Sequence, residues 1–240
     1  MKYNLSKIIN IKNYTLIKIL FFYIVYFFST KKKFYKFLIS NFYSSYSQVY
    51  QDLVVLYYLE SKKNGSFIEI GGGDGVIISN TYLLEKKYKW KGIICEPNSR
   101  LKSNIKLKRN SKHEERPITN KSYEKIKFHE NVDPYQSSIF NDRNSSNTKT
   151  TKSISLNNLL DENKLSKVDY ISIDTEGNEY DILSEFEFKK YDIKIFTIEH
   201  NYNKNKRKKI LNIMKKNNYI RIHKNLSYMD DWFIKENLNE

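Results

Sequence analysis

The sequence is poor in several residue types, and each shortage narrows the classes of protein that it can be. Its 240 residues contain one cysteine, three prolines, seven glycines and no alanine. The lone Cys95 excludes an intrachain disulfide bond and favours a reducing compartment such as the cytoplasm. The length allows one α/β domain with a full core and an N-terminal appendage.

The formal net charge of +15 would ordinarily suggest a nucleic acid or an anionic membrane as partner. However, the chain lacks alanine and is crowded with Lys, Asn, Ile and Tyr, whose codons are rich in A and T. Genome composition therefore explains much of the lysine content. The basic runs at Lys31–Lys33 and from Lys204 to Lys209 are typical of solvated faces. We therefore predict that nucleic acid is not the partner.

A long hydrophobic run is also missing. The apolar stretch from Leu16 to Phe28 is interrupted by Lys18 and is shorter than the roughly 20 residues that span a bilayer. No small-residue cleavage site follows it, which argues against a secretory signal. Two interpretations stay open. The stretch is either a helix at the membrane surface, with Lys31–Lys33 at the headgroups, or a helix packed on the domain or on a second subunit. We predict residues 1–43 as this N-terminal segment and residues 44–240 as the main domain.

The scarce glycines are concentrated in one place. Four of the seven lie between Gly71 and Gly75, directly after the apolar strand pattern that begins at Ser66. Such a cluster indicates backbone that must approach a ligand closely or adopt positive φ. An acid two residues before the first glycine, here Glu69, is typical of an S-adenosylmethionine site. A dinucleotide site would need a third glycine at position 76, which is Val76.

The rest of the chain alternates between strand and helix patterns, which predicts a doubly wound parallel sheet with helices on both faces. Two closing strands without a helix between them predict an antiparallel hairpin at one edge. The polar segment from Asn131 to Lys152 is typical of a mobile loop. The strands are expected at residues 66–71, 92–96, 116–120, 125–129, 168–174, 194–199, 219–223 and 228–234.

Ligands of such sheets bind at the carboxyl ends of the strands. Glu96 ends the second strand and can accept hydrogen bonds from ribose hydroxyls, while Asn120 ends the third. Glu69 and Asp74 flank the glycines, where carboxylates suit the cationic ammonium and sulfonium of S-adenosylmethionine. Asp74 has a second interpretation, as the cap of the following helix.

A cluster of acids follows the buried strand that ends near Ile173. Asp174, Glu176 and Glu179 lie within six residues, where unpaired burial would be costly, so we expect them to face a cleft. They can serve as a general base, as ligands of a divalent cation or as helix caps. His200 ends the neighbouring strand and is expected to approach Asp174 or Glu176, because adjacent strands lie about 4.8 Å apart.

These residues resemble those of FkbM-type methyltransferases over roughly residues 47–234. The resemblance rests on the order of six blocks: Ser47-Gln48 with Gln51-Asp52, Glu69 to Gly75, Ser79-Asn80-Thr81, Glu96-Pro97-Asn98, Asp174 to Glu179, and Glu199-His200-Asn201. It implies a Rossmann-like class I methyltransferase sheet, S-adenosylmethionine as the methyl donor, and O-methylation, often of sugars or natural products. The residues expected around the cofactor are Gln51, Glu69, Gly71, Gly73, Asp74, Asn80, Glu96 and Asn120.

We therefore expect an O-methyltransferase that acts on a sugar, a surface glycan or a small metabolite. Asp174, Glu176 and His200 are its predicted catalytic residues, and no obligatory metal is expected. Two alternatives stay open: a methyltransferase of RNA or another nucleic acid, and a non-catalytic binding module. The Asn/Asp-Pro-Pro-Tyr/Phe motif of amino-nitrogen methyltransferases is missing at Asp174, which argues against the first.

Overall fold

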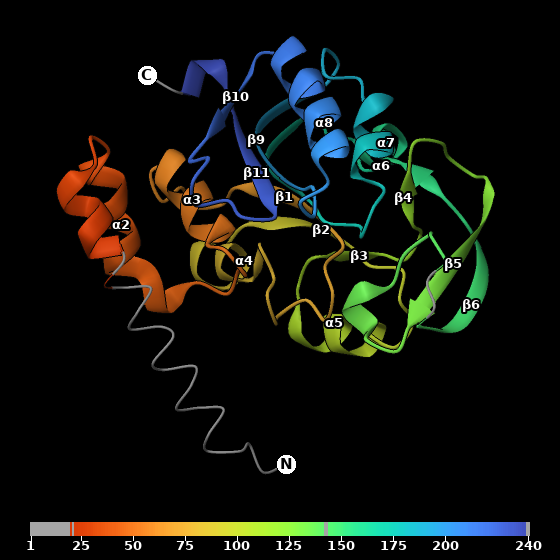
Figure 1. Cartoon of the computed structure of the whole chain (residues 1–240). Coiled ribbons are helices and arrows are strands. Elements are labelled where there is room, and N and C mark those ends of the chain that lie inside the picture. Colours follow the sequence, from red (N-terminus) through yellow and green to blue (C-terminus); the bar gives the residue numbers. More distant parts are fainter. Residues whose placement is uncertain (1–19, 21, 142–143, 239–240) are drawn as a thin grey trace. The chain divides into compact units, whose positions relative to one another are not determined.

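The computed structural model describes residue 20 and residues 22–141 and 144–238, and it divides the chain into two units (Figure 1). One unit ends at Ser45 and the other begins at Tyr46. The first unit contains a helical segment at residues 22–28, α2 (Lys32–Asn41) and a 3-10 turn (Phe42–Ser44). The ring of Phe22 meets that of Phe42 edge-on, with centroids 5.9 Å apart.

The predicted apolar stretch from Leu16 to Phe28 lies only partly within the described residues, which exclude 16–19 and 21. Among the helices that the structure describes, none combines the length and the apolar character that crossing a membrane requires.

The second unit is built on a seven-stranded sheet in the order β10-β11-β9-β8-β1-β2-β3. All neighbouring strands run parallel except β11, which is antiparallel to both β9 and β10. The fold predicted from the sequence, a mainly parallel α/β sheet with helices on both faces and an antiparallel edge, is confirmed. The strands are β1 (Ser66–Ile70), β2 (Lys91–Cys95), β3 (Lys112–Glu114), β8 (Lys167–Ile173), β9 (Asp192–Glu199), β10 (Tyr219–Ile222) and β11 (Asp230–Lys235).

Helices cover both faces of this sheet (Figure 1). Side chains of α6 (Leu156–Glu162), α7 (Glu179–Ser184) and α8 (Lys204–Lys216) share one core with Ile68 and Ile70 of β1. Because side chains alternate along a strand, Phe67 and Glu69 point to the opposite face. That face carries α3 (Gln51–Tyr58), α4 (Tyr82–Tyr88) and the end of α5 (Lys102–Lys108).

The strand expected at residues 116–120 is not the third strand of the main sheet. That position belongs to β3, whereas β4 (Ile118–Thr119) pairs with β7 (Ile154–Ser155) in a separate two-stranded sheet. Pro117 lies between β3 and β4 in the sequence. Because proline cannot donate a ladder hydrogen bond, the main sheet does not continue through this position.

The prediction of a mobile loop from Asn131 to Lys152 is wrong at Asn131 and at residues 145–152, which form strands. β6 (Ser145–Lys152) pairs in antiparallel fashion with β5 (Lys125–Asn131), and the short helix η2 (Pro134–Gln136) lies between them (Figure 1). We call residues 125–152 the arm. Most of β6 is exposed or half-buried, so its sequence shows no hydrophobic alternation.

Candidate functional site

A cavity lies at the carboxyl ends of β1, β2, β8 and β9, where ligands of such sheets bind. Its volume of about 460 Å³ falls in the range of small-molecule sites. Residues of the arm also line it. The lining comprises Gln48, Glu69–Gly73, Ile77–Asn80, Cys95–Pro97, Pro117, Ile118, Phe128, Asp133–Ile139, Asp174–Glu176, Asn178, Glu199, Asn201 and Met229.

The glycine loop approaches its surroundings as closely as the sequence predicts. Gly71 has φ of 83°, and a Cβ atom there would lie 1.6 Å from the carbonyl oxygen of Asp174. Gly73 has φ of 54°, and its Cβ atom would lie 2.7 Å from the ring of Tyr135. Because neither glycine has a side chain, the glycine loop fits between Asp174, which follows β8, and Tyr135 of the arm.

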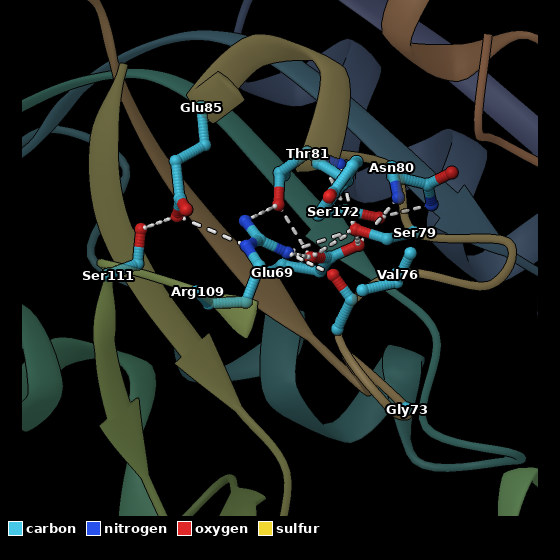
Figure 2. Close-up of polar contacts among 12 residues, drawn as sticks. Glu69, Gly73, Val76, Ser79, Asn80, Thr81, Glu85, Arg109, Ser111 and Ser172 are labelled. Carbon is cyan, nitrogen blue, oxygen red and sulfur yellow. Dashed lines mark hydrogen bonds and ion pairs between the residues drawn. The ribbon is translucent and has the colours of Figure 1, made fainter. Parts of the chain in front are cut away.

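Glu69 organises the segment that follows this loop (Figure 2). Its carboxylate accepts hydrogen bonds from the Ser79 hydroxyl at 3.0 Å, the Asn80 amide at 2.6 Å and the Thr81 hydroxyl at 2.5 Å. Glu69 lines the cavity, but these contacts direct its oxygens toward the protein. Contact with a cofactor, which the sequence predicts for Glu69, stays a prediction.

Arg109 completes this network, and the sequence analysis did not single it out. Its guanidinium is fully buried and lies between two carboxylates, 3.5 Å from Glu69 and 3.1 Å from Glu85 (Figure 2). It also donates to the Gly75 carbonyl at 2.8 Å. Because Arg109 follows a lysine-rich helix, nothing in its local sequence distinguishes it from the surface cations around it.

Glu96 joins the glycine loop to β2. Its two oxygens accept hydrogen bonds from the amides of Gly73 at 3.0 Å and Asn98 at 2.8 Å. Burial raises the pKa of Glu96 to about 7. Each oxygen keeps a lone pair for a further donor, so a ligand hydroxyl at this wall of the cavity would find an acceptor.

Three acids gather on the opposite wall. Oxygen atoms of Asp174, Glu176 and Glu199 lie within 4.8 Å of one another. Burial raises the pKa of the Asp174 and Glu199 carboxyls, and the repulsion among these acids raises both further. Such a group can hold a shared proton, and its oxygens are also of the kind that bind Mg²⁺.

The structure brings Asp174 and Glu176 together as predicted, but it places Glu199 beside them instead of His200. His200 does not line the cavity. Its buried ring lies 3.7 Å from Asp231, and its Nδ1 accepts a hydrogen bond from the Tyr202 amide at 3.1 Å. Neighbouring side chains at a strand end point to opposite sides, so only one residue of the Glu199-His200 pair can face the cleft.

Three other residues expected at the cofactor lie outside the lining. Asp74 accepts hydrogen bonds from the amides of Val76 at 2.9 Å and Ile77 at 2.7 Å, which close a turn; it does not cap the following helix, which begins at Tyr82 with Thr81 as its N-cap. Gln51 donates to Asp230 at 2.6 Å, and its neighbour Gln48 lines the cavity instead. Asn120 is half-buried beyond β4, because the chain has already left the main sheet.

Two buried acceptors in the cavity have no hydrogen-bond partner among the described residues. They are Oδ1 of Asn80 and Oε2 of Glu199, whose side chains are nine-tenths buried. Unpaired acceptors of this kind favour a ligand that brings donors or positive charge. The ammonium, sulfonium and ribose hydroxyls of S-adenosylmethionine have that chemistry, so the residues present fit this cofactor.

The arm contributes a wall that sequence reasoning missed. Tyr135 packs over Gly73, and Ser138 donates a hydrogen bond to the carbonyl of Glu176 at 3.2 Å. Asn98 donates to the Ser137 hydroxyl at 2.8 Å, which ties the arm to the end of β2. The polar composition of the arm carries no signal of these contacts, since they depend on pairing between β5 and β6.

Comparison with known proteins gives a family match. A protein-family model described as Methyltransferase FkbM domain matches residues 69–221, more than half of the chain. No curated protein matches the chain. Among solved structures, a precorrin-6y C5,15-methyltransferase from Geobacter metallireducens is 12% identical over 71% of each chain, with a TM-score of 0.42. A Methanococcus jannaschii fibrillarin pre-rRNA processing protein is 14% identical over 73% of this chain and 68% of its own, with a TM-score of 0.40.

Proposed function

Because the chain belongs to the FkbM methyltransferase family, we propose that it methylates a hydroxyl group of a sugar, a surface glycan or a small metabolite. The observation that carries this proposal is the position of three acids, Asp174, Glu176 and Glu199, in the same cavity as the glycine loop. A carboxylate near the acceptor suits a hydroxyl, which must lose a proton as it is methylated.

The cofactor side of the proposed site is formed by Gly71, Gly73, Asn80 and Glu96. Bound S-adenosylmethionine would supply an activated methyl group on its sulfonium. Glu96 would accept hydrogen bonds from the ribose, and the unpaired Oδ1 of Asn80 would accept one from the ammonium group. Holding both reactants in line accounts for about 7–11 kcal/mol of barrier in well-oriented reactions.

The acidic side would handle the proton. Asp174 and Glu199 have raised pKa values because they are buried beside each other, so one member of the pair can take up the proton that the acceptor hydroxyl loses. A positioned base of this kind contributes typically 10²–10⁴-fold in rate. We assign this role to Glu199 ahead of His200, because Glu199 lines the cavity.

The charge of the cavity favours a neutral acceptor over a nucleic acid. Among its described lining residues, six are acids and none is lysine or arginine. The phosphates of an RNA strand would meet carboxylates here, whereas RNA-binding sites offer cations and aromatic platforms. Sugar hydroxyls are neutral, so the carboxylates do not repel them, and they can donate hydrogen bonds to these acids.

The test uses purified full-length protein and methyl-labelled S-adenosylmethionine. Glycans, lipids, RNA and small metabolites are fractionated from cells and offered separately, and the labelled product is identified by mass spectrometry. We expect label in a glycan or metabolite, joined as a methyl ether. Glu199→Gln should lose the transfer, while the exposed Glu185→Gln serves as the matched control.

Other outcomes separate the alternatives. Label in RNA would replace the proposal with a nucleic-acid methyltransferase. Saturable binding of S-adenosylhomocysteine without transfer to any fraction would support a non-catalytic binding module. The absence of both binding and transfer would contradict the proposed function altogether.

A further inference from the structure

The first unit exposes large apolar side chains along one side of a helical segment. Phe22 belongs to the same segment but is buried. The exposed residues recur at spacings of three and four, which places them on one face, and their exposed fractions run from 47% to 89%. We call them the apolar stripe: Leu20, Tyr23, Ile24, Phe27 and Phe28.

Isolated exposed hydrophobic residues are normal on a protein surface, but a contiguous set is not. The two most exposed members of the stripe, Phe27 and Phe28, are adjacent bulky rings at the end of the helical segment. Keeping five such side chains in water is unfavourable because the hydrophobic effect scales with exposed apolar area. The stripe therefore points to something that covers it.

The residues next to the stripe indicate what covers it. Lys31, Lys32, Lys33 and Lys36 follow it and are all exposed, and none has an acidic partner in the described part of the chain. The first 51 residues of the sequence contain eight lysines and no Asp or Glu, so they carry +8 of the net +15. Codon composition can enrich lysine, but it does not account for four lysines between residues 31 and 36 in a segment of 51 residues without an acid.

We propose that the apolar stripe binds the surface of an anionic lipid bilayer. Its aromatic and aliphatic side chains would enter the boundary between headgroups and acyl chains, and the four lysines would contact anionic headgroups. A second copy of the chain fits the surface less well, because pairing two stripes would bring two uncompensated lysine clusters together. This inference does not depend on the proposed methyl transfer.

The test measures sedimentation of the full chain with phosphatidylcholine vesicles and with phosphatidylcholine vesicles that contain phosphatidylglycerol. We expect binding to the anionic vesicles that weakens as salt is added, because screening reduces the attraction. Each lysine near an anionic surface contributes roughly fivefold, so replacing Lys31, Lys32 and Lys33 with Gln should weaken binding on the order of a hundredfold.

Phe27→Ser combined with Phe28→Ser should weaken binding to both kinds of vesicle, by roughly tenfold or more for each ring. The matched apolar control is Leu107→Ser with Val132→Ser, two exposed positions in the second unit. The matched charge control replaces Lys208, Lys215 and Lys216 with Gln, three exposed lysines of α8. Both controls should bind vesicles like the parent chain, and thermal unfolding of the second unit should be unchanged in every variant.

Equal sedimentation of the stripe variants and their controls would overturn the proposal. So would the absence of vesicle binding together with a dimer that dissociates in the Phe27→Ser, Phe28→Ser variant, because the stripe would then be an interface between two copies. A preference for neutral over anionic vesicles would contradict the role of the lysines.

Discussion

The carbonyl oxygen of Asp174 lies where a side chain on Gly71 would have to be. The two residues end neighbouring parallel strands, β1 and β8, and the amide of Asp174 donates a hydrogen bond to the carbonyl of Ile70 at 2.9 Å. The loop that would hold the cofactor is thereby in contact with the backbone of the residue that would serve the acceptor. A substitution in the glycine loop should therefore also displace Asp174.

We first predict that Gly71→Ala damages both stability and cofactor binding. The new Cβ atom would meet backbone at 1.6 Å, and φ of 83° is strained for any residue other than glycine. Overpacking costs about 1–3 kcal/mol, and a left-handed conformation adds about 1–2 kcal/mol. Gly72→Ala is the comparison: its Cβ atom would lie 2.3 Å from the Cγ2 methyl of Ile94 and 3.8 Å from Cγ of Glu69, so it also overpacks, but its nearest neighbours are side-chain atoms and its φ is not left-handed. Urea unfolding compares the two, and equal losses would contradict this account.

We next predict that Arg109→Met destabilises the second unit strongly. The substitution would leave Glu69 and Glu85 buried without their shared cation, which typically costs about 3–5 kcal/mol. Lys102→Gln removes a cation from the exposed pair with Glu115 and should cost less than about 1 kcal/mol. Chemical denaturation measures both, and a small loss for Arg109→Met would mean that the buried network contributes little.

The placement of Glu199 and His200 leads to a third prediction. Glu199→Gln should lower kcat by roughly 10²–10⁴-fold with little change in the affinity for S-adenosylhomocysteine, because the proton acceptor is lost. His200→Asn should act mainly on stability, since its ring contacts Asp231 and the Tyr202 amide. The opposite pattern would restore His200 as the base.

The same kinetic assay tests the expectation that no metal is required. Treatment of the parent protein with a chelator should leave kcat unchanged. Activity that disappears on chelation and returns with Mg²⁺ or Mn²⁺ would instead make the oxygens of Asp174, Glu176 and Glu199 a cation site.

Stability should depend on pH through the buried acids. The raised pKa of Glu199 means that the folded chain binds more protons than the unfolded chain above the ordinary pKa of 4.5. The free energy of unfolding should therefore fall as pH rises from that value through the raised pKa, and then level off. Glu199→Gln should flatten this slope and be more stable than the parent at alkaline pH, while Glu185→Gln should follow the parent. Identical slopes in all three proteins would show that Glu199 titrates normally.

A last prediction concerns the cofactor. Calorimetry should detect a saturable site for S-adenosylhomocysteine and no tight site for NADH, because Val76 occupies the position of the third dinucleotide glycine. Glu96→Ala should weaken the binding by about 1.5–3 kcal/mol, the usual contribution of a hydrogen bond to a charged group. Tight NADH binding without S-adenosylhomocysteine binding would overturn the cofactor assignment.

The sequence by itself determined the class of the fold and the position of the glycine loop and Glu96 at the edge of the sheet where the cavity lies. The strand pattern before Gly71 and the glycine cluster depend on local conformational rules, so they can be recognised without tertiary contacts. The alternation of strands and helices likewise predicts a parallel sheet, and position at a strand end is enough to bring Glu96 and Asp174 to one edge. The family match over residues 69–221 agrees with the motifs that first suggested it.

Only the tertiary structure decided which side chains complete the site. Adjacent side chains at the end of β9 point to opposite sides, so only one of Glu199 and His200 faces the cavity. A shift of one residue in the register of β9 would exchange the two. Arg109 matters because two distant carboxylates lie beside it, and the arm matters because polar strands pair with each other. These features arise from contacts between residues far apart in the chain, for which a local sequence pattern carries no signal.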